Sequence, residues 1–185
     1  MSTTVSKKTV KMHGWGRYPI IESHSHPLSS QQSTPPIITG LNGADNIARG
    51  LGRSYGDSSL AAESLDAVKL DHFLAFDEST GILSCEAGVS FSEILQFFIP
   101  KGWFLPVTPG TQFITVGGAI ASDVHGKNHH LEGSFSEHVI ELTLALANGE
   151  IRACSASHNR ELFLATCGGM GLTGVILKAS FKMKP

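Results

Sequence analysis

The sequence is poor in charge: of its 185 residues, only 16% are charged, with 14 basic and 16 acidic side chains. A net charge of −2 gives no broad positive field, which argues against generic nucleic-acid binding. No apolar run approaches the roughly 18 residues that a membrane span needs. The start, from Met1 to Lys11, is polar and has no signal-like apolar segment behind it. We therefore expect a soluble, cytoplasmic protein without a transmembrane segment.

Cysteine is also scarce. Cys85, Cys154 and Cys167 are an odd number, and no two of them have the short spacing of a zinc knuckle or a redox dithiol. We expect reduced, mostly buried thiols. Glycine, in contrast, is plentiful at 20 residues and is clustered. Because glycine lets the backbone adopt positive φ or approach a ligand closely, these clusters are where a functional site is expected.

The chain divides into three stretches that together predict an α+β fold. Residues 1–36 form a polar N-terminal segment, expected to be extended and to dock through Trp15, with His24 and His26 solvated. Residues 37–108 are predicted to form a first lobe, and residues 109–185 a second lobe.

Local patterns place regular structure in the first lobe. Ala67–Leu70 and Ile82–Glu86 have the composition of short strands. Ser90, followed three positions later by Glu93, predicts a helix opened by a capping box. Gly102 is placed to end that helix.

The second lobe reads as strand, turn, strand, helix and strand. His138–Ala147 alternates polar and apolar residues, which predicts a half-buried strand. Asn148-Gly149 suits a type I′ turn, and Ile151–Cys154 can return as the partner strand. Asn159 is expected to cap a helix, and Leu172–Met183 is apolar enough for a final strand.

The first glycine cluster combines glycines with two arginines. Its backbone amides can curl around an anion, while Arg49 and Arg53 supply positive charge. The cluster therefore predicts a phosphate-bearing ligand; the alternative is a tight surface turn with solvated arginines. The predicted binding residues are Ala48, Arg49, Gly50, Leu51, Gly52, Arg53, Ser54, Tyr55, Gly56, Asp57 and Ser58.

The same stretch also matches the Gly-x-Ser-x-Gly pattern of serine hydrolases, with Ser54 as the nucleophile. That nucleophile elbow needs a buried strand before the serine and a helix after it. The preceding Asp45–Leu51 is too polar for a buried strand. The hydrolase remains an alternative that leaves the other glycine clusters unexplained.

The second glycine cluster extends over Pro109–Gly126. Its small residues from Gly117 to Ser122 would let a short helix press its backbone against a flat ring or a diphosphate. The N-terminus of that helix is expected to offer free N–H groups to the ligand. The alternative is close packing between the two lobes.

The third glycine cluster, Gly168–Gly174, contains a formal Gly-x-Gly-x-x-Gly motif at 169–174. The dinucleotide-binding fingerprint of this form must follow a strand and open a helix. Here the predicted helix comes before the glycines and the predicted strand after them. We interpret the cluster as a helix-to-strand turn beside a ligand.

Histidines at 125, 129 and 130 raise the question of a metal. Adjacent His129 and His130 cannot easily face one ion, and Gly126 argues against a regular helix that would join His125 to His129. No metal site is predicted.

In this order, the motifs resemble the flavin-binding domain of the vanillyl-alcohol-oxidase superfamily, and within it the sugar and polyol oxidases. The most specific stretches are His125–His130 and Gly133-Ser134-Phe135. The resemblance covers nearly the whole chain. It also rests on Gly14–Arg17, Ala48–Asp57, Pro109–Thr111, Thr115–Ala121, Ala147–Arg152, Glu161–Phe163 and Gly171–Leu177.

The resemblance implies a two-lobed α+β domain of the PCMH type, with FAD between the lobes. The 48–58 loop and the 115–118 turn would hold the diphosphate, and Val175 or Ile176 would offer backbone to the adenine. Some members tether the flavin through a histidine in the first loop, where this chain offers Ser54 and Tyr55, so noncovalent FAD is expected. Beyond the first loop, the implied cofactor-binding residues are Pro109, Gly110, Thr115, Val116, Gly117, Gly118, Ser122, Asp123, Val124, His125, Val175 and Ile176.

The resemblance further implies an FAD-dependent oxidoreductase that oxidises a carbinol of a sugar, polyol or polyprenyl-phosphoryl sugar by hydride transfer to flavin N5. His125, Lys127 and Tyr55 are the implied catalytic candidates, although each has a bland alternative as a ligand contact, a solvated charge or a packing residue. Relatives continue into a substrate domain that this chain lacks, and they usually have a helix where Ile37–Asn46 stands. The chain alone is therefore expected to be incomplete. A flavin-binding module without turnover is the alternative.

Overall fold

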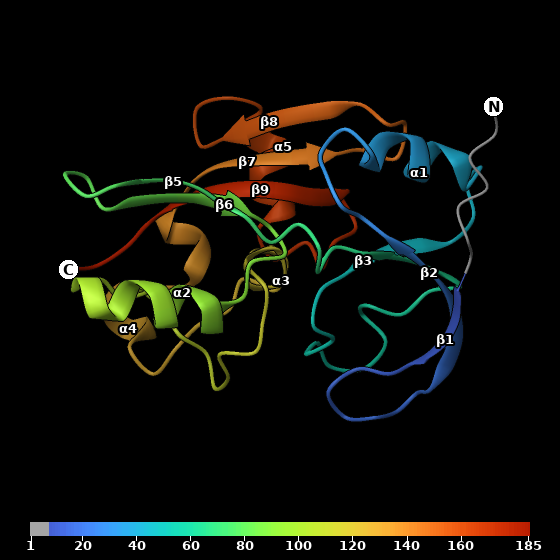
Figure 1. Cartoon of the computed structure of the whole chain (residues 1–185), viewed down its shortest axis with the longest axis horizontal. Coiled ribbons are helices and arrows are strands. Elements are labelled where there is room, and N and C mark those ends of the chain that lie inside the picture. The colour runs from blue at the N-terminus through green and yellow to red at the C-terminus, as the bar shows by residue number, and fades with distance from the viewer. Residues whose placement is uncertain (1–7) are drawn as a thin grey trace.

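The computed structural model describes residues 8–185 and contains two β-sheets (Figure 1). The first sheet has four strands in the order β1-β2-β4-β3, in which β1 and β2 are antiparallel while β4 is parallel to both its neighbours. These strands are β1 (Lys8–Met12), β2 (Ile21–Pro27), β3 (Asn46–Arg49) and β4 (Glu63–Asp66). Helix α1 (Thr34–Gly40) connects β2 to β3.

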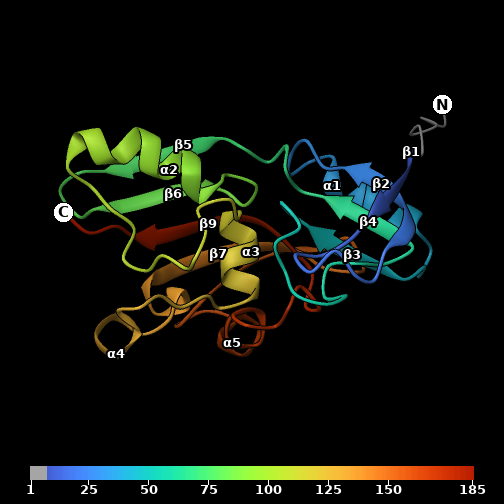
Figure 2. The same cartoon turned by 90° about the horizontal axis from the view of Figure 1, so that it is seen from below.

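The second sheet has five strands in the order β5-β6-β9-β7-β8, and all neighbours are antiparallel. Helices α2 and α3 pack against this sheet (Figure 2). Within residues 8–185, no helix combines the length and apolar character needed to cross a membrane. The elements are β5 (Phe73–Asp77), β6 (Ile82–Glu86), α2 (Phe91–Phe98), α3 (Val116–Ala121), α4 (His129–Glu132), β7 (Val139–Ala145), β8 (Ile151–Ser155), α5 (Arg160–Thr166) and β9 (Val175–Lys182).

The observed sheets correct the predicted division of the chain. The N-terminal segment supplies β1 and β2, so it is part of the first sheet; its residues 1–7 lie outside the described residues. The change from one sheet to the other falls between Asp66 and Phe73 instead of at 108/109. The reason is long-range pairing: Ile82 of β6 lies opposite Lys182 of β9, a contact that no local pattern announces.

The first sheet also corrects the expectation for the N-terminal histidines. His26 is only 4% exposed, and its Nε2 is hydrogen-bonded to the Glu63 carboxylate, while His24 Nδ1 lies 3.1 Å from the other oxygen. Parallel pairing of β2 with β4 places Glu63 opposite His24. His26 is therefore a buried, partnered residue and not a solvated one.

The strand predicted over Ala67–Leu70 is wrong, because the strand lies four residues earlier. Strand β4 ends at Asp66, whose Oδ1 accepts a hydrogen bond from the Val68 N–H at 3.1 Å. The Leu70 N–H then donates to the Ala67 carbonyl at 3.0 Å. Ala67–Leu70 is thus the turn through which the chain crosses from one sheet to the other.

The predictions around α2 are confirmed. Strand β6 has the predicted bounds. The Ser90 hydroxyl accepts the Glu93 N–H, and the Glu93 carboxylate accepts the Ser90 N–H, so both halves of the capping box are present. Gly102 ends the short 3₁₀ turn that continues α2, with a φ of 81°.

The β7–β8 hairpin is confirmed, but two of its details differ from the predictions. The end of β7 is covered on both faces and not half-buried, because Leu144 belongs to one core cluster and Ala145 to another. The turn is not type I′: Gly149 has a φ of 82°, whereas Asn148 does not have positive φ. The Asn148 side chain instead accepts the Glu150 N–H at 2.9 Å.

Helix α5 and strand β9 lie where they were expected, although β9 starts only at Val175. Asn159 precedes α5 but makes no side-chain cap. Its Nδ2 donates to the Ala153 carbonyl at 2.8 Å, which ties the start of α5 to β8.

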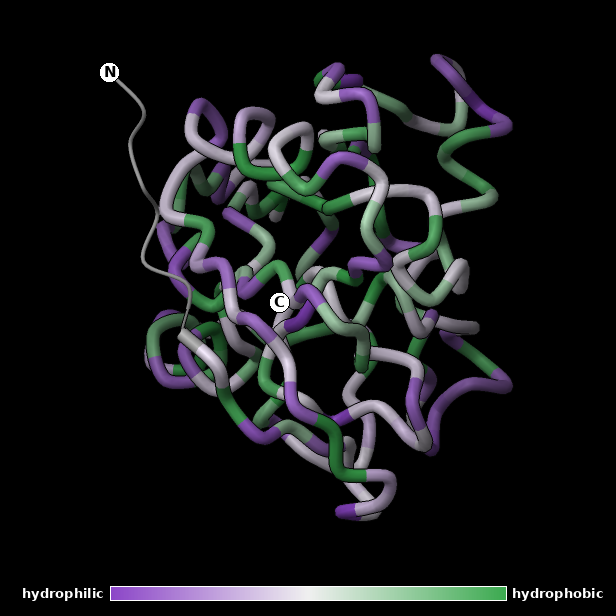
Figure 3. Tube along the Cα trace, turned by 90° about the vertical axis from the view of Figure 1, so that its right-hand side faces the viewer, coloured by the Kyte–Doolittle hydropathy of each residue, from purple (hydrophilic) through white to green (hydrophobic). Residues whose placement is uncertain are grey.

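Two buried clusters hold the molecule together. The larger one joins the second sheet to α2 and α3. The smaller one, called here the junction cluster, joins the two sheets; Figure 3 shows hydrophilic residues at the outer turns and hydrophobic ones mainly inside. The junction cluster consists of Leu28, Ile38, Leu65, Ala67, Leu70, Ala145, Val175 and Leu177.

The crossover turn rests on Gly88, whose N–H donates to the Leu70 carbonyl at 2.7 Å. A methyl group added at Gly88 would overlap the carbonyl oxygen of Ala67 and lie 2.6 Å from that of Leu70. Backbone atoms cannot move aside as a flexible side chain can. The junction between the sheets therefore requires glycine at this position.

We predict that Gly88→Ala lowers the free energy of unfolding by at least about 2 kcal/mol, because overpacking here acts on rigid backbone. Urea unfolding followed by circular dichroism measures the change. The matched control is Gly40→Ala at the end of α1, where an added Cβ has no atom within 4 Å. Equal stability of the two variants would contradict the requirement for glycine at position 88.

Candidate functional site

A cleft of about 620 Å³ lies between the first loop after β3 and the start of α3. This volume is within the range of about 300–1,000 Å³ typical of ligand sites. The lining comes from both sheets and from all three glycine clusters. The lining residues are Trp15, Ala48–Tyr55, Ser58, Ser59, Ala67, Ala87, Pro109–Thr111, Ile114, Thr115, Gly117, Gly118, Ala121–His125, Met170, Gly171, Gly174 and Ile176.

Most of the residues predicted for cofactor binding lie in this cleft. Four do not: Gly56 and Asp57 are exposed on the outer part of the loop, and Val116 and Val175 are buried in the two cores. The binding roles of the others remain predictions. The predicted residues that line the cleft are Ala48–Tyr55, Ser58, Pro109, Gly110, Thr115, Gly117, Gly118, Ser122–His125 and Ile176.

Sequence reasoning did not assign several lining residues. Ser59 directly follows the predicted first loop, and Thr111 lies inside the second glycine cluster, so the predicted motifs point to both. Ala67 and Ala87 carry no chemical signal, because a small apolar residue marks a cleft floor only once the two sheets are placed. Trp15 belongs to the N-terminal segment, which the sequence sets apart from the two lobes.

The first loop presents backbone donors to the cleft. Among residues 8–185, the N–H groups from Gly50 to Tyr55 have no hydrogen-bond acceptor. The protein itself therefore does not use these donors. Successive backbone N–H groups of this kind form a nest, which is a concave anion-binding arrangement. The loop thus has the donors that a phosphate group needs.

Arg49 braces this loop. Its guanidinium donates to the Ser59 carbonyl at 3.1 Å, to the Ser59 hydroxyl at 3.0 Å and to the His13 carbonyl at 2.8 Å. Burial lowers the pKa of the Arg49 guanidinium, although Asp66 opposes this effect. A side chain at Gly52, which has a φ of 66°, would collide with the guanidinium. Arg49 therefore braces the loop and also lines the cleft, and its role in binding stays a prediction.

Arg53 is the arginine that faces solvent. Its Nη1 donates to the Leu51 carbonyl at 2.9 Å, and its guanidinium carbon lies 5.8 Å from the centre of the Trp15 ring. Its remaining donors have no acceptor in the described part of the chain. Arg53 can therefore add positive charge to the nest.

The structure corrects the prediction for the N-terminus of α3. The Val116 N–H donates to Val89 and the Gly117 N–H to Ala87, both at 2.8 Å, and the Gly118 N–H donates to the Thr115 hydroxyl at 3.1 Å. None of these groups is free for a ligand. Helix α3 instead lets a ligand come close to its backbone, because Gly118 lines the cleft, is exposed and has no side chain.

The third glycine cluster is the helix-to-strand turn that was predicted, and it also fixes α3. The Gly168 N–H donates to the Ile120 carbonyl at 3.0 Å, and the Met170 N–H to the Ala121 carbonyl at 2.8 Å. These bonds give hydrogen-bond donors to the last carbonyl groups of α3, which have no partner within the helix. Gly171 and Gly174 then line the cleft.

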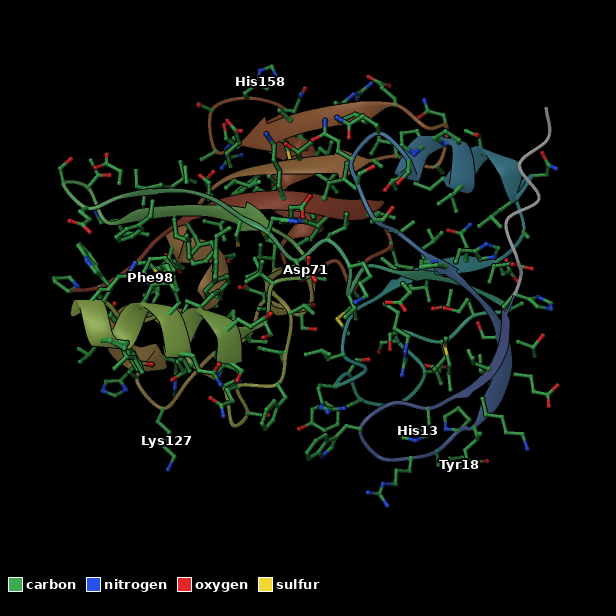
Figure 4. All side chains as sticks on the ribbon, in the orientation of Figure 1. His13, Tyr18, Asp71, Phe98, Lys127 and His158 are labelled. Atoms are coloured by element: carbon green, nitrogen blue, oxygen red, sulfur yellow. The ribbon has the colours of Figure 1, made fainter. Side chains whose placement is uncertain are left out.

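The three catalytic candidates are not all in the cleft. His125 and Tyr55 line it and are exposed, with Tyr55 77% accessible. Lys127 is not among the lining residues, and its side chain extends away from the body of the protein (Figure 4). The segment that carries His125 and Lys127 is closed by Asp123. Its carboxylate accepts hydrogen bonds from the Ser134 hydroxyl at 2.8 Å and the Ser136 N–H at 3.0 Å.

Two clusters have metal-ligand residue types. The rings of His125 and His129 are 5.7 Å apart, and those of His129 and His130 are 5.8 Å apart. Asp71, His72 and Glu86 bring three ligand atoms within 4.8 Å of one another, outside the cleft lining. There, His72 Nδ1 lies 2.8 Å from the Glu86 carboxylate, and this hydrogen bond raises the pKa of His72.

Ser54 does not have the surroundings of a hydrolase nucleophile. Its hydroxyl lies 2.7 Å from that of Ser59, and a turn over 56–59 follows it where a nucleophile elbow would start a helix. Ser59 is itself held by a hydrogen bond from Arg49, so the partner of the Ser54 hydroxyl is part of the loop's support. The hydrolase reading therefore loses its basis.

The sequence profile of the family described as "FAD binding domain" matches residues 41–155. The decaprenylphosphoryl-beta-D-ribose oxidase of Mycolicibacterium smegmatis is 43% identical over an alignment of 197 positions, which covers 100% of this chain and 42% of that protein. A putative D-arabinono-1,4-lactone oxidase of Neurospora crassa is 30% identical over 72% of this chain and 24% of the relative. The L-gulonolactone oxidase of Bos taurus is 26% identical over 96% of this chain and 41% of the relative.

All three cysteines are free, and none has the character of a reactive thiolate. Burial raises the pKa of Cys154 and Cys167 to about 11, and for Cys167 the nearby Asp123 adds to the effect. Burial raises the pKa of Cys85 as well.

We predict that Cys167 is alkylated slowly at pH 8. A rise in its pKa from 9.0 to about 11 reduces the thiolate fraction about a hundredfold, so the rate should keep rising up to about pH 11. Iodoacetamide labelling with peptide mass spectrometry measures each cysteine separately. A rate that already levels off near pH 9 would disprove the shift.

Proposed function

The chain belongs to the family of FAD-binding domains, since that family's profile matches residues 41–155, and from this premise we propose that the cleft binds FAD noncovalently. The observation that carries the proposal is the row of N–H groups without acceptors from Gly50 to Tyr55. A diphosphate supplies the acceptors that these donors need. The two glycine-rich walls leave room for the rest of the cofactor.

The diphosphate is proposed to lie against the first loop and not at the N-terminus of α3. The loop combines the N–H nest with Arg53, whereas the first three N–H groups of α3 are occupied within the protein. Arg49 keeps the nest in shape through Ser59 and His13. In this proposal Arg53 binds the diphosphate, and Arg49 supports the loop.

The two ends of the cofactor are assigned by exposure. The buried lining residues Ala67 and Ala87 have small side chains, and we assign the adenine end of the cofactor to this inner part of the cleft. Exposed Tyr55 and His125 lie at the mouth. The ring that exchanges electrons with a substrate must be reachable from the mouth, so the isoalloxazine is proposed to lie there.

We propose that the whole protein is an oxidoreductase that acts on a carbinol of a sugar, a polyol or a polyprenyl-phosphoryl sugar. Two of the relatives are named as oxidases of a decaprenylphosphoryl ribose and of a lactone. Bound FAD would supply the redox chemistry by accepting a hydride. We propose His125 and Tyr55, which line the cleft, as the groups that hold or accept the hydroxyl proton, while Lys127 would have to swing inward to take part.

The chain spans 42% of the length of the ribose oxidase it matches, so turnover is proposed to need a substrate-binding part from outside these residues. A flavin-binding module without turnover remains the second candidate for the isolated chain. The cytoplasmic location stays a prediction.

We predict that the purified chain binds FAD, and that the flavin moves to the supernatant when the protein is precipitated with acid. The absorption spectrum before and after precipitation measures both. A pellet that keeps its yellow colour would contradict noncovalent binding. A colourless preparation that also fails to take up added FAD would contradict FAD binding by this chain.

Arg53→Gln is expected to weaken FAD binding about tenfold, because a charge-assisted hydrogen bond to phosphate contributes about 1.5 kcal/mol. The loss should shrink at high salt. FAD titration by fluorescence measures the dissociation constant. The matched control is Arg160→Gln, an exposed arginine on α5 outside the cleft lining; equal effects of the two substitutions would remove Arg53 from the site.

A further inference from the structure

The tip of the β1–β2 hairpin forms one edge of the cleft. Trp15, at this tip, is 55% exposed and belongs to the cleft lining. Large apolar side chains at a cleft edge mark a binding surface more strongly than isolated exposed ones elsewhere. Resting on the proposed FAD site, we propose that the Trp15 indole stacks on the isoalloxazine ring of FAD at the mouth of the cleft, beside Arg53.

The hairpin tip is fixed to the first loop. The Trp15 N–H donates to the Ser54 carbonyl at 2.8 Å, and the His13 carbonyl accepts from Arg49 at 2.8 Å. A Cβ added at Gly14 would lie 2.6 Å from the Ser54 carbonyl oxygen, so the two backbones are in close contact there. The position of Trp15 is therefore set by the same loop that carries the N–H nest.

The Trp15 ring has a cation at one side and no aromatic neighbour in the described part of the chain. The guanidinium carbon of Arg53 lies 5.8 Å from the ring centre, at the outer limit of a cation–π contact. A half-exposed indole can stack on a flat aromatic ring, and the neighbouring guanidinium can bond to a phosphate chain that the ring carries. Both ends of FAD are flat, so the two ends must be distinguished.

Exposure favours the isoalloxazine end. Trp15 and Tyr55 lie at the open mouth, whereas the floor is made of the small side chains Ala67 and Ala87. The diphosphate, held at Gly50–Tyr55, separates the two ends of the cofactor. The end beside Trp15 is then the one that a substrate can reach, which is the isoalloxazine.

Fluorescence can test this directly, because the protein has only two tryptophans. Trp103 packs against Phe76, with ring centres 5.2 Å apart, and is not part of the cleft lining. In Trp103→Phe, Trp15 is the only indole. FAD should quench its emission, whereas ADP, which lacks the isoalloxazine, should leave most of it.

Affinity gives the second readout. Trp15→Ala should raise the dissociation constant for FAD about three- to tenfold, which corresponds to one aromatic contact. Trp15→Phe should restore most of the affinity, and Trp103→Phe should match the wild type. Every variant keeps the backbone N–H that bonds to Ser54, so the effect isolates the side chain; thermal melting confirms that each variant is folded.

Unquenched Trp15 emission at saturating FAD, together with wild-type affinity in Trp15→Ala, would overturn the proposal. Equal quenching by ADP and FAD would also overturn it, because Trp15 would then contact the adenine end. Failure of the proposed function looks different: the wild-type chain would show no FAD uptake in the absorption titration.

Discussion

The structure depends on three residues, Ala87–Val89, that connect parts of the chain far apart in sequence. The Ala87 N–H bonds to Leu177 of β9, and the Gly88 N–H to Leu70 of the crossover turn. The carbonyls of Ala87 and Val89 accept the first N–H groups of α3. One short segment thus joins the first sheet, the second sheet and the helix that walls the cleft. The junction cluster then packs the two sheets together around it.

The chemistry of the cleft follows from this connection. The first N–H groups of α3 donate to the carbonyls of Ala87 and Val89, so they cannot also bind an anion. The N–H groups of the first loop are not used in this way. Arg49 bonds to Ser59 and His13, and the hairpin tip bonds to the Ser54 carbonyl, so these contacts hold the loop without its N–H groups. Two glycine-rich segments that look alike in sequence therefore do different work. One is a donor surface, and the other is a wall without side chains.

Local sequence rules predicted the elements whose causes are local. The Ser90 capping box, strand β6 and the β7–β8 hairpin needed only neighbouring residues. The predicted lobe boundary is wrong because β6 pairs with the distant β9, with Ile82 opposite Lys182. Strand β4 was missed because its polar Glu63 and Ser64 are buried by pairing with β2 and β3 on either side, so no apolar alternation marks it.

For the site, composition identified the correct segments but not the use of each group. Glycine spacing and two arginines are visible in the sequence, yet only the fold shows that Arg49 is spent on Ser59 and His13 while Arg53 stays available. The same holds for Trp15, which becomes part of the cleft only because β2 pairs with β4 and brings the hairpin tip to Ser54. A residue's chemistry can be read from the chain. Whether that chemistry is free to meet a ligand depends on which neighbours already use it, and those neighbours are distant in sequence.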